Sequence, residues 1–172
     1  MENYLQYRPK EFQFVAGWVR NWFSNFAESP FELNDIRWRS VENYYQAMKT
    51  LDVSIRQRIA YMTPAQAKKA GRNLLIRPDW ENIKYDVMIT ALRAKFSNED
   101  WTKKLLATEN EVLIEWNNWN DKIWGVSIKD NLGENKLGKA LMKIREELNE
   151  KYLLKDTSLG KFLVSKQQTN IY

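Results

Sequence analysis

The chain has 172 residues, a net charge of +5 and 44% hydrophobic residues, which is typical of a single globular domain. It contains neither cysteine nor histidine, so disulfides, thiolate nucleophiles, histidine general bases and zinc sites built from these residues are excluded. Because there is no long apolar run and no signal-peptide pattern, we expect a cytoplasmic protein, and nothing in the sequence calls for a metal or other cofactor.

The positive charge is concentrated at the end of the chain. Residues 151–172 hold four lysines against one aspartate, which accounts for +3 of the net +5. This balance suits an anionic partner, such as a phosphorylated metabolite or nucleic acid, or else a solvated lysine-rich surface. We therefore expect one domain over residues 1–150 and a basic C-terminal extension over 151–172, which either adds a short strand or has no regular structure.

The first part of the chain mixes aromatic residues with turn signals. This pattern predicts short strands near residues 12–15, 31–33 and 36–39. Asn34-Asp35 lies between the last two strands and is a plausible hairpin turn. Residues 21–28 follow neither period, so a packed loop is expected there.

Helix signals begin at Ser40, which can cap a helix that runs to about Lys49. A second helix is predicted from Thr63, where Pro64 occupies the first helical position and Gln66 completes a capping box. This helix should end near Gly71.

Further helices are predicted over residues 78–96, 99–107 and 134–151. The last of them carries an apolar stripe at helical spacing, namely Leu137, Leu141, Ile144 and Leu148. Residues 111–116 are compatible with a strand or with the end of a helix. The predicted fold is therefore mainly α (α+β), a single compact helical domain with a small N-terminal antiparallel sheet.

The segment SVENYYQAMK places one polar stripe on an otherwise apolar helix. Glu42, Gln46 and Lys49 are spaced i, i+4 and i+7, so they lie on the same face. This stripe is either a solvent-facing Glu–Lys pair or the catalytic face of a pocket.

Two later segments combine structural and functional readings. Trp80, in the first turn of a helix, either packs on the core or offers a stacking surface for a planar base. Gly138 lies inside a helix, where glycine costs about 1 kcal/mol relative to alanine, so another helix or a ligand should approach it closely. Asn135 either orients a ligand hydroxyl or caps that helix.

The segment WNNWNDKIWG crowds three tryptophans and several short polar residues into an irregular stretch. As part of LIEWNNWNDKIWG, and together with WFSNFAESPF, SVENYYQAMK, TPAQAKKAGR, the Trp80 segment with AKFS and GENKLGKALMKIREEL, it resembles the YbiA-like NADAR family over residues 12–148. The most specific parts are the Glu–Gln–Lys helix, the D-x-x-W-G turn that begins at Asp121, and the run from Gly133 to Arg145.

The resemblance implies a mainly helical fold with a small sheet and an N-glycosidase activity, which hydrolyses the bond between ribose C1 and a nitrogen. The implied substrates are ADP-ribosyl-guanine in nucleic acid or ribosylaminopyrimidine phosphates of riboflavin synthesis. Two departures stand out. Asn43 replaces a common histidine, which suggests that the histidine is not essential, and Val126-Ser127 follows the Trp-Gly pair where a further glycine is frequent.

Such a reaction develops positive charge on the sugar and negative charge on the departing nitrogen. We expect Glu42 near C1, where it activates water or stabilises the cationic sugar. Lys49 would donate a proton or form a Schiff base, and the sequence leaves both open. Asp121 would hold ribose hydroxyls or a lysine.

The tryptophans would then form part of the substrate pocket. We expect the Trp124 indole, held by Gly125, to stack on the base, while Trp116 and Trp119 buttress the loop from the core. Gln46, Trp80, Asn135 and Gly138 complete the expected binding set. Two other functions fit the sequence: a non-catalytic module that binds ADP-ribose or NAD, and a nucleic-acid accessory protein that acts through its basic surface.

Overall fold

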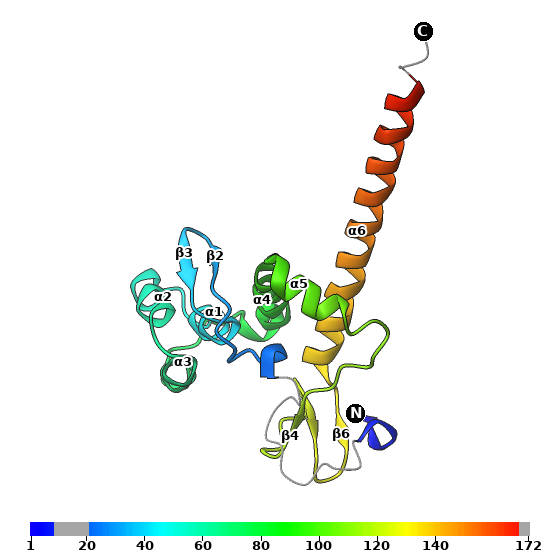
Figure 1. The fold of residues 1–172 in the computed structure, drawn as a ribbon. Helices are drawn as coiled ribbons and strands as arrows, with labels where there is room; N and C mark the ends of the chain where they lie inside the picture. Colours follow the sequence, from blue (N-terminus) through cyan, green and yellow to red (C-terminus); the bar gives the residue numbers. More distant parts are fainter. Residues whose placement is uncertain (9–20, 169–172) are drawn as a thin grey trace.

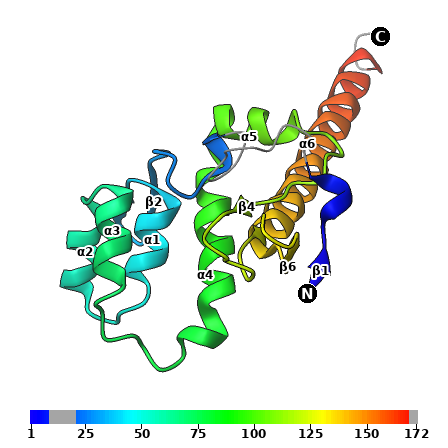
Figure 2. The ribbon, with the colours of Figure 1, turned by 90° about the horizontal axis from the view of Figure 1, so that it is seen from below.

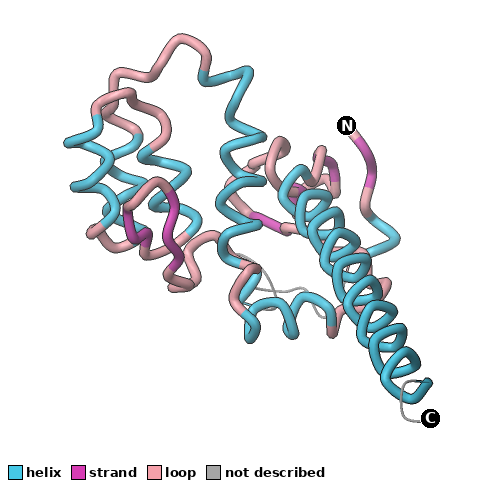
Figure 3. The backbone as a smooth tube through the Cα atoms, turned by 90° about the horizontal axis from the view of Figure 1, so that it is seen from above, coloured by secondary structure: helices cyan, strands magenta, loops and turns pink. Residues whose placement is uncertain are grey.

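The computed structural model describes residues 1–8 and 21–168, and the side chains of residues 1–8 and 22–152. Within these residues, helix α4 (Trp80–Lys95) lies between two groups of elements. One group holds α1 to α3, and the other holds the C-terminal helix α6 with a small sheet (Figures 2 and 3). The helical content and the small sheets confirm the predicted α+β fold class.

The N-terminal hairpin forms as the sequence predicts. Strands β2 (Phe31–Leu33) and β3 (Ile36–Trp38) pair antiparallel. Asn34 and Asp35 both have positive φ, 54° and 58°, which is the backbone geometry of a tight two-residue hairpin turn. The strand expected near residues 12–15 lies outside the described residues. Two short 3-10 helices, Leu5–Tyr7 and Asn21–Phe23, flank that region.

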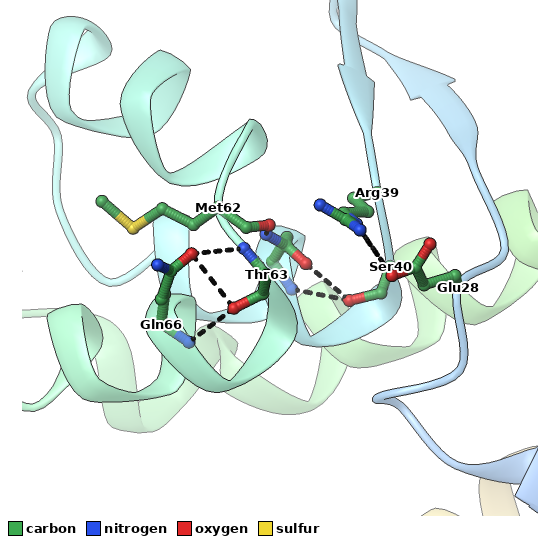
Figure 4. Close-up of polar contacts among 7 residues, drawn as sticks. Glu28, Arg39, Ser40, Met62, Thr63 and Gln66 are labelled. Atoms are coloured by element: carbon green, nitrogen blue, oxygen red, sulfur yellow. Dashed lines mark hydrogen bonds and ion pairs between the residues drawn. The ribbon is translucent and has the colours of Figure 1, made fainter.

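Helix α1 (Val41–Ala47) is the centre of the first group and packs against α2, α3 and α4. The Ser40 hydroxyl accepts a hydrogen bond from the Asn43 amide and so caps the helix (Figure 4). The helix ends at Ala47, slightly before the expected Lys49. All seven of its residues are buried, so its polar side chains must face other protein groups or an internal cavity.

Helix α3 (Pro64–Gly71) has the predicted bounds and the predicted capping box between Thr63 and Gln66 (Figure 4). Helix α2 (Val53–Ala60) was not predicted. Only Ile59 and Ala60 of α2 are buried, so its apolar stripe is too narrow to give a clear helical period.

The third and fourth predicted helices correspond to α4 and to α5 (Glu99–Leu106), each within about two residues. The Asn98 side chain caps α5 by accepting hydrogen bonds from two backbone amides of its first turn. Helix α5 packs against α6, and α6 also packs against α4.

A second, four-stranded sheet was not predicted. It has the order β1 (Glu2–Asn3), β6 (Leu132–Gly133), β5 (Val126–Ser127), β4 (Trp116–Asn117), and β4 and β5 are parallel. Two-residue strands are too short to show an alternating pattern, which explains why the sequence did not reveal them. Residues 111–115 form neither the strand nor the helix end that was expected.

Helix α6 (Lys136–Gln168) begins with the predicted apolar stripe, of which Leu137, Leu141 and Ile144 are buried. It continues without a break through residue 150 and projects away from the rest of the chain (Figure 1). The expectation of a short strand or an irregular end after residue 151 is therefore wrong. Among the described residues, no helix is both long and apolar enough to cross a membrane.

Candidate active site

A cavity of about 440 Å³ lies between the α1–α3 group and the loop that joins β4 to β5. Its wall is built from residues 24–26, from α1, α3 and α4, and from residues 115–124. The expected site residues that line it are Glu42, Gln46, Asp121 and Trp124. Those that lie outside its wall are Lys49, Trp80, Gly125, Asn135 and Gly138.

Glu42 reaches the cavity from the first turn of α1 and is only 6% exposed. Its backbone amide donates to the Asn25 carbonyl at 3.0 Å, which ties α1 to the cavity wall at residues 24–26. Its carboxylate accepts a hydrogen bond of 2.8 Å from the Gln46 side-chain amide. Burial raises the pKa of Glu42, while this hydrogen bond and the nearby cations Lys68, Lys49 and Arg72 oppose the rise.

Three buried side-chain oxygens in the described part of the chain have no hydrogen-bond partner in the protein: Asn25 Oδ1, Gln46 Oε1 and Glu115 Oε2. All three belong to residues that line this cavity. Buried polar groups are normally paired, so such a concentration marks a place that is suited to polar groups of a ligand. The Gln46 oxygen lies against Gly71, where a Cβ would come within 1.9 Å of it, so a larger residue at position 71 would force the Gln46 amide to move.

The loop between β4 and β5 is held by Asn117, which is fully buried. Its side chain accepts from the Asp121 amide at 2.8 Å and donates to the Asp121 carbonyl at 2.7 Å. Asp121 in turn accepts from the Ile123 and Trp124 amides through Oδ1, each at 3.0 Å. The short polar residues of this segment therefore build a rigid turn, and Asp121 both shapes that turn and lines the cavity.

Glu115 is a cavity residue that the sequence did not single out. Burial, together with the negative charges of Asp121 and Glu42, raises the pKa of its carboxyl to about 8, while Lys68 opposes the rise. The sequence signal that could have identified Glu115 is its position between the apolar residues Ile114 and Trp116, which are both buried in the structure. An acidic side chain between two buried apolar residues is uncommon unless it is paired.

The structure gives three expected binding residues a positioning role instead. Asn135 donates to the Leu113 carbonyl at 2.9 Å and accepts from the Glu115 amide at 3.1 Å. At Gly138 a Cβ would lie 2.1 Å from the Leu113 carbonyl, so the group that approaches this glycine is the neighbouring backbone. At Gly125 a Cβ would lie 2.3 Å from the Glu115 carbonyl. All three residues fix the segment that carries Glu115.

Replacing Asn135 by alanine should therefore destabilise the protein by about 2–4 kcal/mol. The variant leaves the Glu115 amide and the Leu113 carbonyl without their buried partners, and alanine tolerates the φ of 51° at this position poorly. Urea unfolding measures the change, with Asn118→Ala, at an exposed position of the β4–β5 loop, as the control. A loss no larger than that of the control would contradict the positioning role.

The three tryptophans of the loop have different environments. Trp116 is 4% exposed and packs in a small second core with Tyr4, as expected for a buttress. Trp119 is 51% exposed and lines the cavity, so the expectation that it supports the loop from the core is wrong. Trp124 lines the cavity while it packs edge-on against Tyr45 and parallel to Tyr85, with ring centroids 5.6 and 6.3 Å apart.

Trp80 and Lys49 both lie next to the ring of Tyr45. Trp80 is 5% exposed and packs edge-on against the Tyr45 ring, with ring centroids 5.0 Å apart. It therefore packs on the core, which is the first of its two expected roles. The Lys49 ammonium lies 5.7 Å from the Tyr45 ring centre and 6.0 Å from that of Trp80. Burial lowers the pKa of Lys49, and the charge of Glu42 opposes this effect. Lys49 is thus electrostatically coupled to Glu42 although it does not line the cavity.

Two further lysines shape the site. Lys68 of α3 lines the cavity, with its ammonium 5.2 Å from the Phe26 ring centre and 5.8 Å from that of Trp119. Lys95 of α4 is buried and donates to the carbonyls of Trp22 and Ser24 at 2.7 and 3.1 Å, which fixes the 24–26 wall. Burial lowers the pKa of Lys95 to about 7. In the described residues, no group of three or more acidic side chains is placed to hold a metal ion.

Comparison with known proteins assigns the chain to a family. The sequence profile of the NADAR domain matches residues 12–149, most of the chain. The chain belongs to the NADAR family. It is 40% identical over 130 residues to the N-glycosidase YbiA of Shigella flexneri, which covers 73% of this chain and 80% of that one.

Other NADAR relatives point the same way. An N-glycosidase of Nostoc punctiforme is 38% identical over 133 residues, which covers 73% of this chain and 84% of that protein. The riboflavin biosynthesis protein PYRR of Zea mays is 36% identical over 145 residues, which is 73% of this chain but 23% of the maize protein. The NMR structure of E. coli YbiA superposes with a TM-score of 0.69 at 38% identity, and the match covers 77% of this chain and 80% of that one.

Asn43, where NADAR proteins commonly have histidine, has a structural role here. It is fully buried, and its side-chain amide donates to the Ile59 and Met62 carbonyls, each at 2.8 Å. It also accepts from the Ser40 hydroxyl at 2.6 Å. Asn43 therefore joins the start of α1 to the end of α2, and it does not line the cavity.

Proposed function

We propose that the cavity is the active site of an N-glycosidase that cleaves the bond between ribose C1 and a nucleobase-type nitrogen. Family membership and the similarity to enzymes named N-glycosidase make this chain a hydrolase of N-glycosyl bonds. The observation that carries the assignment to this cavity is the buried Glu42 carboxylate, which lines the same cavity as Asp121 and the Trp124 indole.

The chemistry of N-glycoside hydrolysis fits these side chains. As the C1–N bond breaks, positive charge develops on the ribose, and a fixed carboxylate within the cavity stabilises it. We assign this role to Glu42, which then takes a proton from the attacking water. Asp121 binds ribose hydroxyls through Oδ2, since its Oδ1 accepts the two backbone amides of the turn.

Two lysines are available as the cationic partner of Glu42. Lys49, which lies on the same helical stripe, acts through its charge and through the orientation of Tyr45, as their contact suggests. Lys68 extends into the cavity wall itself and is suited to bind an anionic group of the substrate, such as a phosphate. A Schiff base at Lys49 would require the side chain to move from the aromatic rings that it now contacts.

The exposed indole of Trp119 and the packed indole of Trp124 offer two surfaces for a planar base. Base stacking is worth roughly 1–3 kcal/mol, so Trp119→Ala and Trp124→Ala should each raise KM by about tenfold or more. Only Trp124→Ala should also lower the melting temperature, because Trp124 packs on Tyr45 and Tyr85.

Steady-state kinetics and thermal unfolding of the two variants separate these effects. The control is Tyr61→Ala, since this aromatic side chain is 84% exposed and lies outside the cavity wall. An unchanged KM in both tryptophan variants would remove the stacking assignment.

Two substrate classes fit such a site: ribosylaminopyrimidine phosphates and ADP-ribosyl-guanine in nucleic acid. The relatives named as riboflavin biosynthesis proteins favour the first class. The net charge of +5 and the lysines of residues 151–172 favour an anionic strand. We place the reaction in the cytoplasm, without a cofactor.

A parallel assay for released base tests the proposal. The purified protein is incubated with an ADP-ribosylated guanine oligonucleotide and, separately, with a ribosylaminopyrimidine phosphate. Release of free base from either substrate supports the proposal and identifies the class. Saturable binding of both without release would show a non-catalytic ADP-ribose or NAD-binding module instead.

A further inference from the structure

The departing nitrogen poses a separate chemical problem in this cavity. A nucleobase or amine nitrogen is a poor leaving group as an anion, so its departure is assisted by a proton donor. Asp121 uses one carboxylate oxygen to accept two backbone amides, and Glu42 accepts from Gln46 and is already assigned to the sugar cation and the attacking water. Because both carboxylates have these other roles, the proton donor is sought elsewhere in the cavity wall.

Glu115 differs from both in its surroundings. Its Oε2 is buried and has no hydrogen-bond partner in the protein, although the residue lines the cavity. The groups that influence its charge are the carboxylates of Asp121 and Glu42 and the ammonium of Lys68. With two acids and one cation around a buried carboxyl, the uncharged form is favoured at neutral pH, in agreement with the raised pKa of about 8.

The backbone around Glu115 is rigid, as a positioned acid requires. Its amide donates to Asn135, and its carbonyl accepts from the Val126 amide at 2.7 Å. Gly125 packs directly against that carbonyl. These contacts come from β5 and from the start of α6, so the backbone that carries the carboxyl is held from two sides.

We propose that Glu115 is the catalytic acid of this cavity and transfers its proton to the departing nitrogen. This role rests on the proposed N-glycosidase function. When the C1–N bond breaks, its electron pair stays on the nitrogen, which takes the Glu115 proton and leaves as a neutral base. Water then bonds to C1 and gives a proton to Glu42, and the passage of that proton back to Glu115 through solvent restores the starting state.

The test compares two leaving groups on ribose C1. One substrate is the ribosylaminopyrimidine phosphate or guanine adduct that the enzyme cleaves, and the other is p-nitrophenyl ribofuranoside 5-phosphate, whose phenolate leaves without a proton. Glu115→Gln should lower kcat/KM on the nitrogen substrate by about 100-fold or more and on the aryl substrate by less than about fivefold. Glu42→Gln should lose both activities.

The pH profile gives a second readout on the nitrogen substrate. For the wild-type protein, kcat/KM should fall above about pH 8, as Glu115 loses its proton, and this fall should be absent from the residual activity of Glu115→Gln. The matched control is Glu111→Gln, at an exposed position four residues earlier in the chain.

The possible failures are distinguishable. An equal loss of both substrates in Glu115→Gln would show a structural role and overturn the proposal, and so would full activity on both. A wild-type protein that cleaves neither substrate would overturn the proposed function and the role of Glu115 with it.

Discussion

Replacing Glu42 by glutamine is expected to lower kcat by about 1000-fold or more while the protein stays folded. The change keeps the size of the side chain and removes only the negative charge. That charge is what stabilises the sugar cation and takes the proton from water. Because the Gln46 amide can still donate to the remaining carbonyl oxygen, α1 and the adjoining wall should be preserved.

A binding measurement and a control variant test this expectation. Substrate binding to Glu42→Gln, measured by calorimetry, should remain within about tenfold of wild type, since stacking and hydroxyl contacts are retained. The control is Glu32→Gln, an exposed carboxylate of β2 that lies outside the cavity wall and should leave kcat unchanged. A kcat near that of wild type in Glu42→Gln would remove Glu42 from the chemistry.

The second large effect concerns the stability of the fold, independently of any substrate. In the native state the pKa of Glu115 is raised from 4.5 to about 8, so between these values the native protein holds a proton that the unfolded chain has released. Stability must therefore fall as pH rises through this window. Glutamine cannot ionise, so Glu115→Gln should be more stable than wild type above pH 8 by about 2–4 kcal/mol.

Urea unfolding from pH 4.5 to pH 9 measures this difference. We expect it to be near zero at pH 4.5, to grow through the window, and to be constant above pH 8. Lys95 acts in the opposite direction above its pKa of about 7, since its native state has then lost a proton that the unfolded chain keeps. That contribution is common to both proteins and cancels in the difference. A pH-independent difference would contradict the buried, protonated Glu115.

The sequence predicted those parts of the fold whose signals are local. The Asn34-Asp35 turn, the Ser40 and Thr63 caps and the apolar stripe of α6 depend on neighbouring residues alone, and all three features are present. The four-stranded sheet is made of two-residue strands, and its outer pairing joins residues about 130 positions apart, such as Glu2 with Gly133. No short window of sequence carries that information, so this sheet was missed.

The same division explains the site. Glu42 and Gln46 share one helix face, so their spacing in the sequence was enough to pair them. Glu115 and Lys68 come to the cavity from elements that meet Glu42 only in three dimensions, and neither shares a helix face with it. Gly138 was correctly expected to be approached closely, and the approaching group is the Leu113 carbonyl. Asn135 was expected to orient a ligand hydroxyl or to cap the helix, and it instead binds the backbone of Leu113 and Glu115.

The most direct measurement is a structure of the Glu42→Gln protein with its substrate bound. We expect the ribose in the cavity of residues 24–26, α1 and the β4–β5 loop, with C1 beside position 42 and the departing nitrogen within hydrogen-bond reach of Glu115. The account would be contradicted by a substrate bound elsewhere, for example in the separate cavity of about 420 Å³ between Met1, Tyr85 and Lys136.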